Sequence, residues 1–137
     1  MPAYNIAKHA SMLGEIDIVS DTFMVLLVGP AFAFNAAHNY VSAISSAEVS
    51  GTGYVRKTIS SKLWTRSDYL SLSALTADNP SWAGIDVGLV AGAVLYRTGS
   101  SDADAMLMGA YAVSPAYMTG TGIFTIKWSS NGVLIVS

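Results

Sequence analysis

The chain has 137 residues, a formal net charge of −2 and no cysteine. These values exclude a disulfide framework and a cysteine-based zinc site, and the absence of a basic field argues against nucleic acid as the main partner. Charged residues make up only 12% of the sequence and hydrophobic residues 52%, whereas about 25% charged residues is usual in a soluble domain.

A membrane protein is the first explanation to test for such a composition. The most apolar segments, 23–34 and 87–96, are shorter than the roughly 20 residues that a spanning helix needs. The N-terminus lacks the basic start, apolar core and cleavage site of a signal peptide. We therefore expect a chain outside the membrane, part of whose charge-poor surface is covered by copies of itself or by a partner.

The first third of the sequence mixes helical and strand patterns. Residues 5–16 have apolar side chains at helical spacing, which predicts a short helix that ends or bends at Gly14. The apolar run at 21–28 predicts a strand buried on both faces. Residues 35–49 place apolar side chains on one side, so a second short helix is expected, with Asn35 able to cap it.

From Gly51 onward, strand patterns dominate. The expected strands lie within 54–65, 68–77, 89–99, 104–113 and 122–137. The polar stretch 98–104 has the length of a hairpin turn, and Asn131-Gly132 predicts a closing hairpin within the last segment. The sequence thus predicts a single domain over 1–137: an all-β, mainly antiparallel, jelly-roll-like β-sandwich with one or two short helices in the N-terminal third.

The stretch Ser-Gly-Thr-Gly-Tyr at 50–54 has the composition of a phosphate-binding loop. A P-loop, however, needs a lysine directly after its last glycine and a helix thereafter. Here Arg56 and Lys57 come later, and the following residues alternate like a strand. We therefore expect a structural role for the two glycines, easing entry into a β-strand.

Motifs that carry chemistry are absent from the sequence. His9 and His38 lie far apart, and neither has a second histidine or a carboxylate at ligand spacing. No nucleophile elbow and no complete calcium loop occurs. We expect no catalytic residue, no cofactor and no metal.

Four of the seven basic residues and all three tryptophans suggest contact surfaces. Arg56, Lys57, Lys62 and Arg66 lie within one short stretch. They form either a charged, solvated edge strand or a contact strip for an acidic partner. Trp64 and Trp82 add candidate interface anchors, with Trp82 in a loop, and the tryptophans could also form a platform for stacking sugars.

Four blocks of the sequence, taken in order, resemble a family of small virion structural proteins encoded by tailed bacteriophages. The blocks are LGEIDIVSDTFMVLLV (13–28), HNYVSAISSAEVSGTGYVRKTI (38–59), AGAVLYRTG (91–99) and FTIKWSSNGVLIVS (124–137). The segment 67–82 departs from the family pattern.

The resemblance implies a particle component without catalytic residues. Within that family we favour a capsid decoration or cement protein, made in the host cytoplasm, that binds the outside of the shell and bridges subunits of the major capsid protein. Self-association is expected as well. Two alternatives stay open: a tail or head-appendage component, and a carbohydrate-binding β-sandwich on the virion surface.

Overall fold

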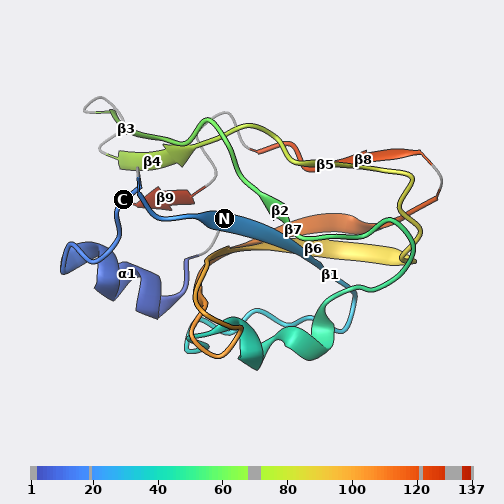
Figure 1. The fold of residues 1–137 in the computed structure, drawn as a ribbon, viewed down its shortest axis with the longest axis horizontal. Coiled ribbons are helices and arrows are strands. Elements are labelled where there is room, and N and C mark those ends of the chain that lie inside the picture. The colour runs from blue at the N-terminus through green and yellow to red at the C-terminus, as the bar shows by residue number, and fades with distance from the viewer. Residues whose placement is uncertain (1–2, 19, 68–71, 121, 129–133, 137) are drawn as a thin grey trace.

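The computed structural model describes residues 3–18, 20–67, 72–120, 122–128 and 134–136, with the backbone alone for 64–67, 72–74 and 134–136. Within these residues the fold is mainly β and the strands pair in antiparallel fashion (Figure 1). This confirms the all-β, antiparallel class predicted from the sequence. No helix in the described residues is long and apolar enough to cross a membrane.

A four-stranded sheet forms the centre of the molecule. Its order is β2 (Lys57–Thr58), β1 (Phe23–Val28), β6 (Leu89–Arg97) and β7 (Met106–Met118). All neighbouring pairs are antiparallel. Strands β6 and β7 are joined through 98–105, so the hairpin predicted around the polar stretch 98–104 is confirmed.

Two smaller sheets lie on one side of the central sheet (Figure 1). One contains β3 (Leu63–Ser67), β4 (Leu72–Thr76) and β9 (Leu134–Val136), and the other pairs β5 (Ser81–Ala83) with β8 (Ile123–Thr125). Helix α1 (Asn5–Met12) and the short 3-10 turns η1 (Val41–Ala43) and η2 (Ser45–Ala47) lie toward the other side. Helix α1 confirms the N-terminal helix, and Gly14 follows its end with a φ of +72°.

The central strands are buried on both faces, as the unbroken apolar run at 21–28 predicts. Phe23, Val25 and Leu27 of β1 belong to the core between this sheet and the smaller ones. Leu26 and Val28 point into a second core, which the N-terminal segment and η1 and η2 cover. Alternation along an extended strand therefore fills two cores from one short segment.

The second predicted helix, over 35–49, is not formed, because its backbone donors are used elsewhere. The amide of Val41 donates to the carbonyl of Ala105, and that of Ser42 donates to the carbonyl of Asp102. Only the two 3-10 turns fit between these tertiary contacts. The Asn35 side chain accepts a hydrogen bond from the Ala37 amide, so it closes a turn instead of capping a helix.

The described parts of the two strands expected in the closing hairpin pair with other strands. Strand β8 pairs with β5 and strand β9 pairs with β4, in two different sheets. Residues Asn131 and Gly132 lie outside the described residues. The Asn-Gly signal is local, whereas the choice of strand partner is made by long-range packing, which the sequence pattern does not contain.

The glycine-rich stretch 50–54 packs directly on the segment before β6. Thr52 forms a bridge with Asp86, whose amide donates to the carbonyl of Thr52. A Cβ atom on Gly51 would lie 2.4 Å from the Asp86 carbonyl oxygen, and one on Gly53 would lie 2.8 Å from that of Gly84. These two glycines thus permit a close approach of two backbone segments, which is a structural role.

We expect Gly53→Ala to lower the free energy of unfolding by about 2–4 kcal/mol, because it combines a positive φ (+75°) with a backbone clash. Gly84→Ala is the matched control: its φ is +67°, but a Cβ there meets no atom within 4 Å. The control should lose only about 1 kcal/mol. Denaturant unfolding measures both, and equal losses would contradict the close approach.

Candidate functional site

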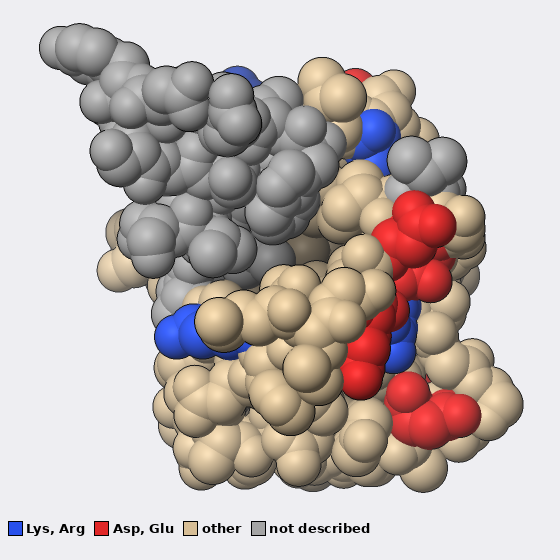
Figure 2. All heavy atoms as spheres, turned by 90° about the vertical axis from the view of Figure 1, so that its left-hand side faces the viewer, with Lys and Arg blue, Asp and Glu red and all other residues tan. Residues whose placement is uncertain are grey.

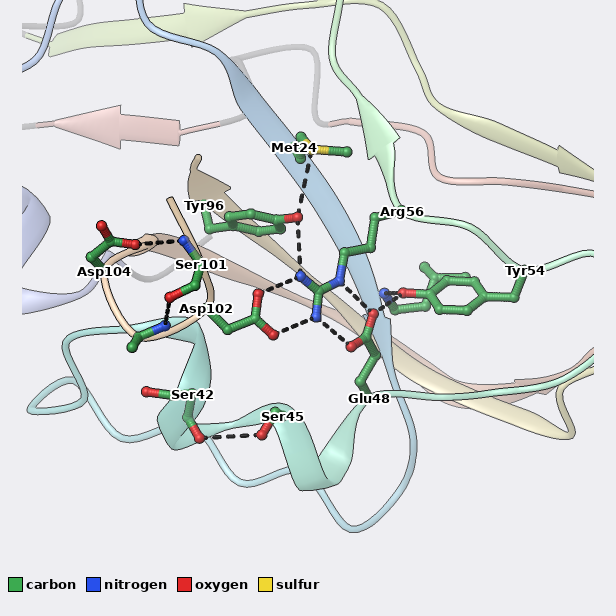
Figure 3. A network of polar contacts seen from close by, with 12 residues as sticks. Met24, Ser42, Ser45, Glu48, Tyr54, Arg56, Tyr96, Ser101, Asp102 and Asp104 are labelled. Carbon is green, nitrogen blue, oxygen red and sulfur yellow. Dashed lines mark hydrogen bonds and ion pairs between the residues drawn. The ribbon is translucent and has the colours of Figure 1, made fainter. Parts of the chain in front are cut away.

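The most extensive polar network among the described residues is built around Arg56 (Figure 3). Its guanidinium lies between the carboxylates of Glu48 and Asp102. Nε and Nη2 donate to the two oxygens of Glu48 at 2.8 and 2.6 Å. Nη1 and Nη2 donate to those of Asp102 at 2.7 and 3.0 Å. Two bidentate pairs therefore share one arginine, the geometry in which such pairs are strongest.

Three separate parts of the chain meet at this arginine. Arg56 itself directly precedes the edge strand β2, Glu48 directly follows η2, and Asp102 lies in the connection between β6 and β7. The Asp102 carbonyl also accepts a hydrogen bond from the Ser42 amide in η1. The ion pairs thus fix the η1–η2 segment and the 98–105 connection to the edge of the central sheet.

Two tyrosines complete the network. The Tyr54 hydroxyl donates to Glu48 at 2.6 Å and accepts from the amide of Leu27 in β1 at 3.1 Å. The Arg56 guanidinium lies 5.5 Å from the centre of the Tyr96 ring and contacts its hydroxyl at 3.4 Å. The cation is thereby stacked on an aromatic face as well as paired.

The pKa values follow from these contacts. Hydrogen bonds from Arg56 lower the pKa of Asp102, and the hydrogen bonds to Glu48 and then Asp102 raise the pKa of Arg56 further. Burial, followed by the bond to Glu48, raises the pKa of Tyr54. Arg56 therefore stays charged and both its carboxylate partners are engaged with it, which suits a structural cross-link.

The structure places Arg56, expected in either a charged edge strand or a contact strip, within a network of contacts inside the chain. Its nitrogens are occupied within the chain, and its side chain is 24% exposed. Lys62 is likewise engaged: its ammonium donates to the Asp21 carbonyl and lies 5.1 Å from the centre of the Phe23 ring. Lys57 is the one of these three whose side chain makes no hydrogen bond or ion pair with another described residue, and it is half-buried on β2.

The predicted contact strip is divided between two sheets. Lys57 lies at one edge of the central sheet, whereas Trp64 and Arg66 lie on β3, at the edge of the three-stranded sheet. Trp64 pairs with Leu75 and Arg66 with Ser73 through the backbone. The side chains of Trp64 and Arg66 lie outside the described part of the structure.

Trp82 does not act as an exposed anchor in this fold. It is 1% exposed, belongs to the core between the sheets, and donates its indole N–H to the Val55 carbonyl at 2.6 Å. Its ring lies 6.0 Å from that of Phe124. A buried ring cannot stack on a sugar, so the expected platform loses one of its members.

Sequence reasoning missed Glu48 and Asp102, which are eight and 46 positions from Arg56. The available signal was the scarcity of charge: in a chain with seven basic and nine acidic residues, an arginine near a buried strand needs carboxylate partners. No sequence spacing identifies which carboxylates these are.

Other charges near the surface are also used inside the chain. Arg97 lies 3.6 Å from the Asp21 carboxylate and donates to the Glu15 carbonyl. Asp104 accepts from Ser100 and Ser101. Figure 2, which looks at the side of the molecule that is on the left in Figure 1, shows red atoms gathered on the right of that face with blue atoms among them, a separate blue group at its left edge, and a tan area between the two.

Several large apolar side chains in the described part of the chain are exposed. Met12 is 89% exposed, Ile123 73% and Met118 62%. Among the residues whose side chains are described, the exposed large apolar ones are Met12, Leu13, Phe34, Tyr40, Val55, Leu63, Leu89, Tyr117, Met118 and Ile123. A surface with such residues and few free charges is suited to contact with other proteins.

No group of histidine, aspartate and glutamate in the described residues is arranged to hold a metal ion. No family model, curated protein or solved structure matches the chain.

We expect Arg56→Lys to lower the free energy of unfolding by about 1–3 kcal/mol, because an ammonium cannot replace two bidentate pairs. Lys57→Met is the matched control, because Lys57 is one residue away and its side chain has no hydrogen-bond or ion-pair partner among the described residues. This variant should change the free energy of unfolding by less than about 0.5 kcal/mol. Denaturant unfolding measures both variants. Equal effects would show that the network does not stabilise the fold.

The Asp102 pair also predicts a pH dependence. Because Arg56 lowers the Asp102 pKa from its ordinary value of 3.8, this pair stabilises the fold above that value and loses its effect as pH falls through the lower folded pKa. The difference in Tm between the wild type and Asp102→Asn should be largest near neutral pH and should shrink below about pH 4. A difference that is independent of pH would contradict the assignment.

Proposed function

We propose that this protein is a structural component of a tailed-phage virion, a decoration or cement protein on the outer surface of the capsid. In this proposal it binds the major capsid protein, associates with copies of itself, bridges neighbouring shell subunits and catalyses no reaction. The sheets then act as the two layers of a jelly-roll-like β-sandwich within a single domain over 1–137.

One observation carries the proposal beyond the sequence resemblance. Several charged side chains near the surface form contacts within the chain, while ten large apolar side chains among the described residues are exposed. Burying apolar surface contributes about 25 cal/mol per Å². Such contacts repeated over a symmetric shell add up, even when each one is weak.

The two alternative functions require different surfaces or copy numbers. A tail or head-appendage component needs the same kind of surface and differs in copy number. A carbohydrate-binding module needs exposed rings, and Trp82 is buried. We therefore retain the tail component as the second candidate.

We expect purified virions to contain this protein in hundreds of copies, near the number of capsid subunits, because a bridging protein occupies every equivalent position on the shell. Quantitative mass spectrometry of particles measures this ratio. A handful of copies would favour the tail component. Particles assembled without the protein should open at a lower temperature, and after a smaller decrease in salt concentration, than complete ones, and equal resistance would refute the cement role.

A further inference from the structure

A groove of about 650 Å³ lies between β7 and the segment that contains β8. One wall is formed by residues 111–114 and Tyr117, and the other by residues 123–127. Tyr117 and Ile123 in these walls are 50% and 73% exposed. The groove is thus partly apolar, open and bounded by extended backbone on both sides.

Both walls are strands with an unpaired edge in the described structure. Strand β7 ends the four-stranded sheet, and its outer edge meets only Tyr40 and the N-terminal residues, at Met106 and Gly109. Strand β8 pairs with β5 alone. Toward β6, the pairing of β7 passes from Gly92–Ala112 to Val90–Tyr117, so residues 113–116 have no partner there either. Unpaired edges of this kind favour the addition of a strand.

Aromatic contacts connect the two walls of the groove. The Tyr111 and Trp128 rings meet edge to face with their centres 5.9 Å apart. Farther along β7, the Tyr117 and Phe124 rings lie 5.3 Å apart. Trp128 is fixed in turn by its indole N–H, which donates to the Asp78 carbonyl. The groove is therefore preformed, which lowers the entropic cost of binding.

The charge of the groove selects its occupant. Lys127 is its only charged lining residue, is exposed, and makes no hydrogen bond or ion pair with a described residue. We propose that this groove binds an extended, mainly apolar segment of a partner protein that carries a carboxylate opposite Lys127. The segment adds a strand between β7 and β8 and joins the central sheet to the β5–β8 sheet.

The source of this segment rests on the proposed function, in which the partner is a shell subunit. The groove itself can be tested without particles. The probe is a capped peptide of sequence Thr-Val-Glu-Val-Thr-Val-Thr, titrated into the isotope-labelled full chain and followed by amide chemical shifts. A second peptide, with lysine in place of glutamate, controls for charge.

The expected result is saturable shifts confined to residues 111–117 and 123–127, with the lysine peptide binding about 2–5-fold more weakly, as for an exposed ion pair. Lys127→Glu should reverse this preference. Lys57 lies on β2, the edge of the central sheet opposite β7, so Lys57→Glu should keep the preference for the glutamate peptide. Shifts elsewhere, or a preference that Lys127→Glu leaves unchanged, would overturn the proposal.

A steric test uses two threonines. Thr125 is exposed and lines the groove, so Thr125→Trp should fill it and weaken the glutamate peptide at least about tenfold. Thr58→Trp is the matched control, because Thr58 is the exposed residue of β2. This variant should bind the glutamate peptide as the wild type does. Peptide binding that survives Thr125→Trp would place the peptide elsewhere and refute the groove.

The outcomes also separate this proposal from the capsid role. Peptide binding in the groove without any association with particles would support the groove as a binding site. It would refute the shell subunit as the partner. Particle association unaffected by Thr125→Trp, with no peptide binding, would refute the groove alone. Concentration-dependent shifts of the same residues without peptide, removed by Lys127→Glu, would show that a second copy occupies the groove and would overturn the assigned partner.

Discussion

The structure depends on a central pair of strands, β1 and β6, that must be covered on both faces. Strand β1 sends alternate side chains into two cores, one beneath the smaller sheets and one beneath the N-terminal segment and the η1–η2 turns. A chain of 137 residues has little length for two covering layers. The demand for apolar residues explains the high hydrophobic content and leaves few positions for surface charge.

The contacts of Arg56 stabilise the parts of the covering layers that are not α-helix or strand. The η1–η2 segment and the 98–105 connection have little regular structure of their own. The two bidentate pairs and the Tyr54 hydroxyl attach both to the sheet edge. The charged side chains in these pairs are therefore not available for contacts with other molecules at the surface. Internal cohesion and a surface poor in free charge therefore have the same origin, and that surface is the main physical support for a role in assembly.

The sequence predicts local features correctly, but it does not predict which distant segments pair with each other. The run at 23–28 and the polar turn before Met106 carry their own signals, so strand β1 and the β6–β7 hairpin were predictable. Residues 35–49 have a helical pattern, but their amides bond to the distant 98–105 connection. The pairing of β8 and β9 and the carboxylate partners of Arg56 depend likewise on tertiary packing. The residues around Trp82 predict an exposed loop, but the large apolar ring is buried in the core.

The segment from Lys57 to Ser67 passes from the central sheet to the smaller three-stranded sheet, and its two ends are held unequally. Strand β2 has two paired positions on β1, whereas β3 has five on β4. Tension applied along this connection would therefore detach the short strand first and leave the longer pairing intact. Detachment of β2 would also draw Ile59, which is buried in the core and donates its amide to the Phe23 carbonyl, away from the central sheet.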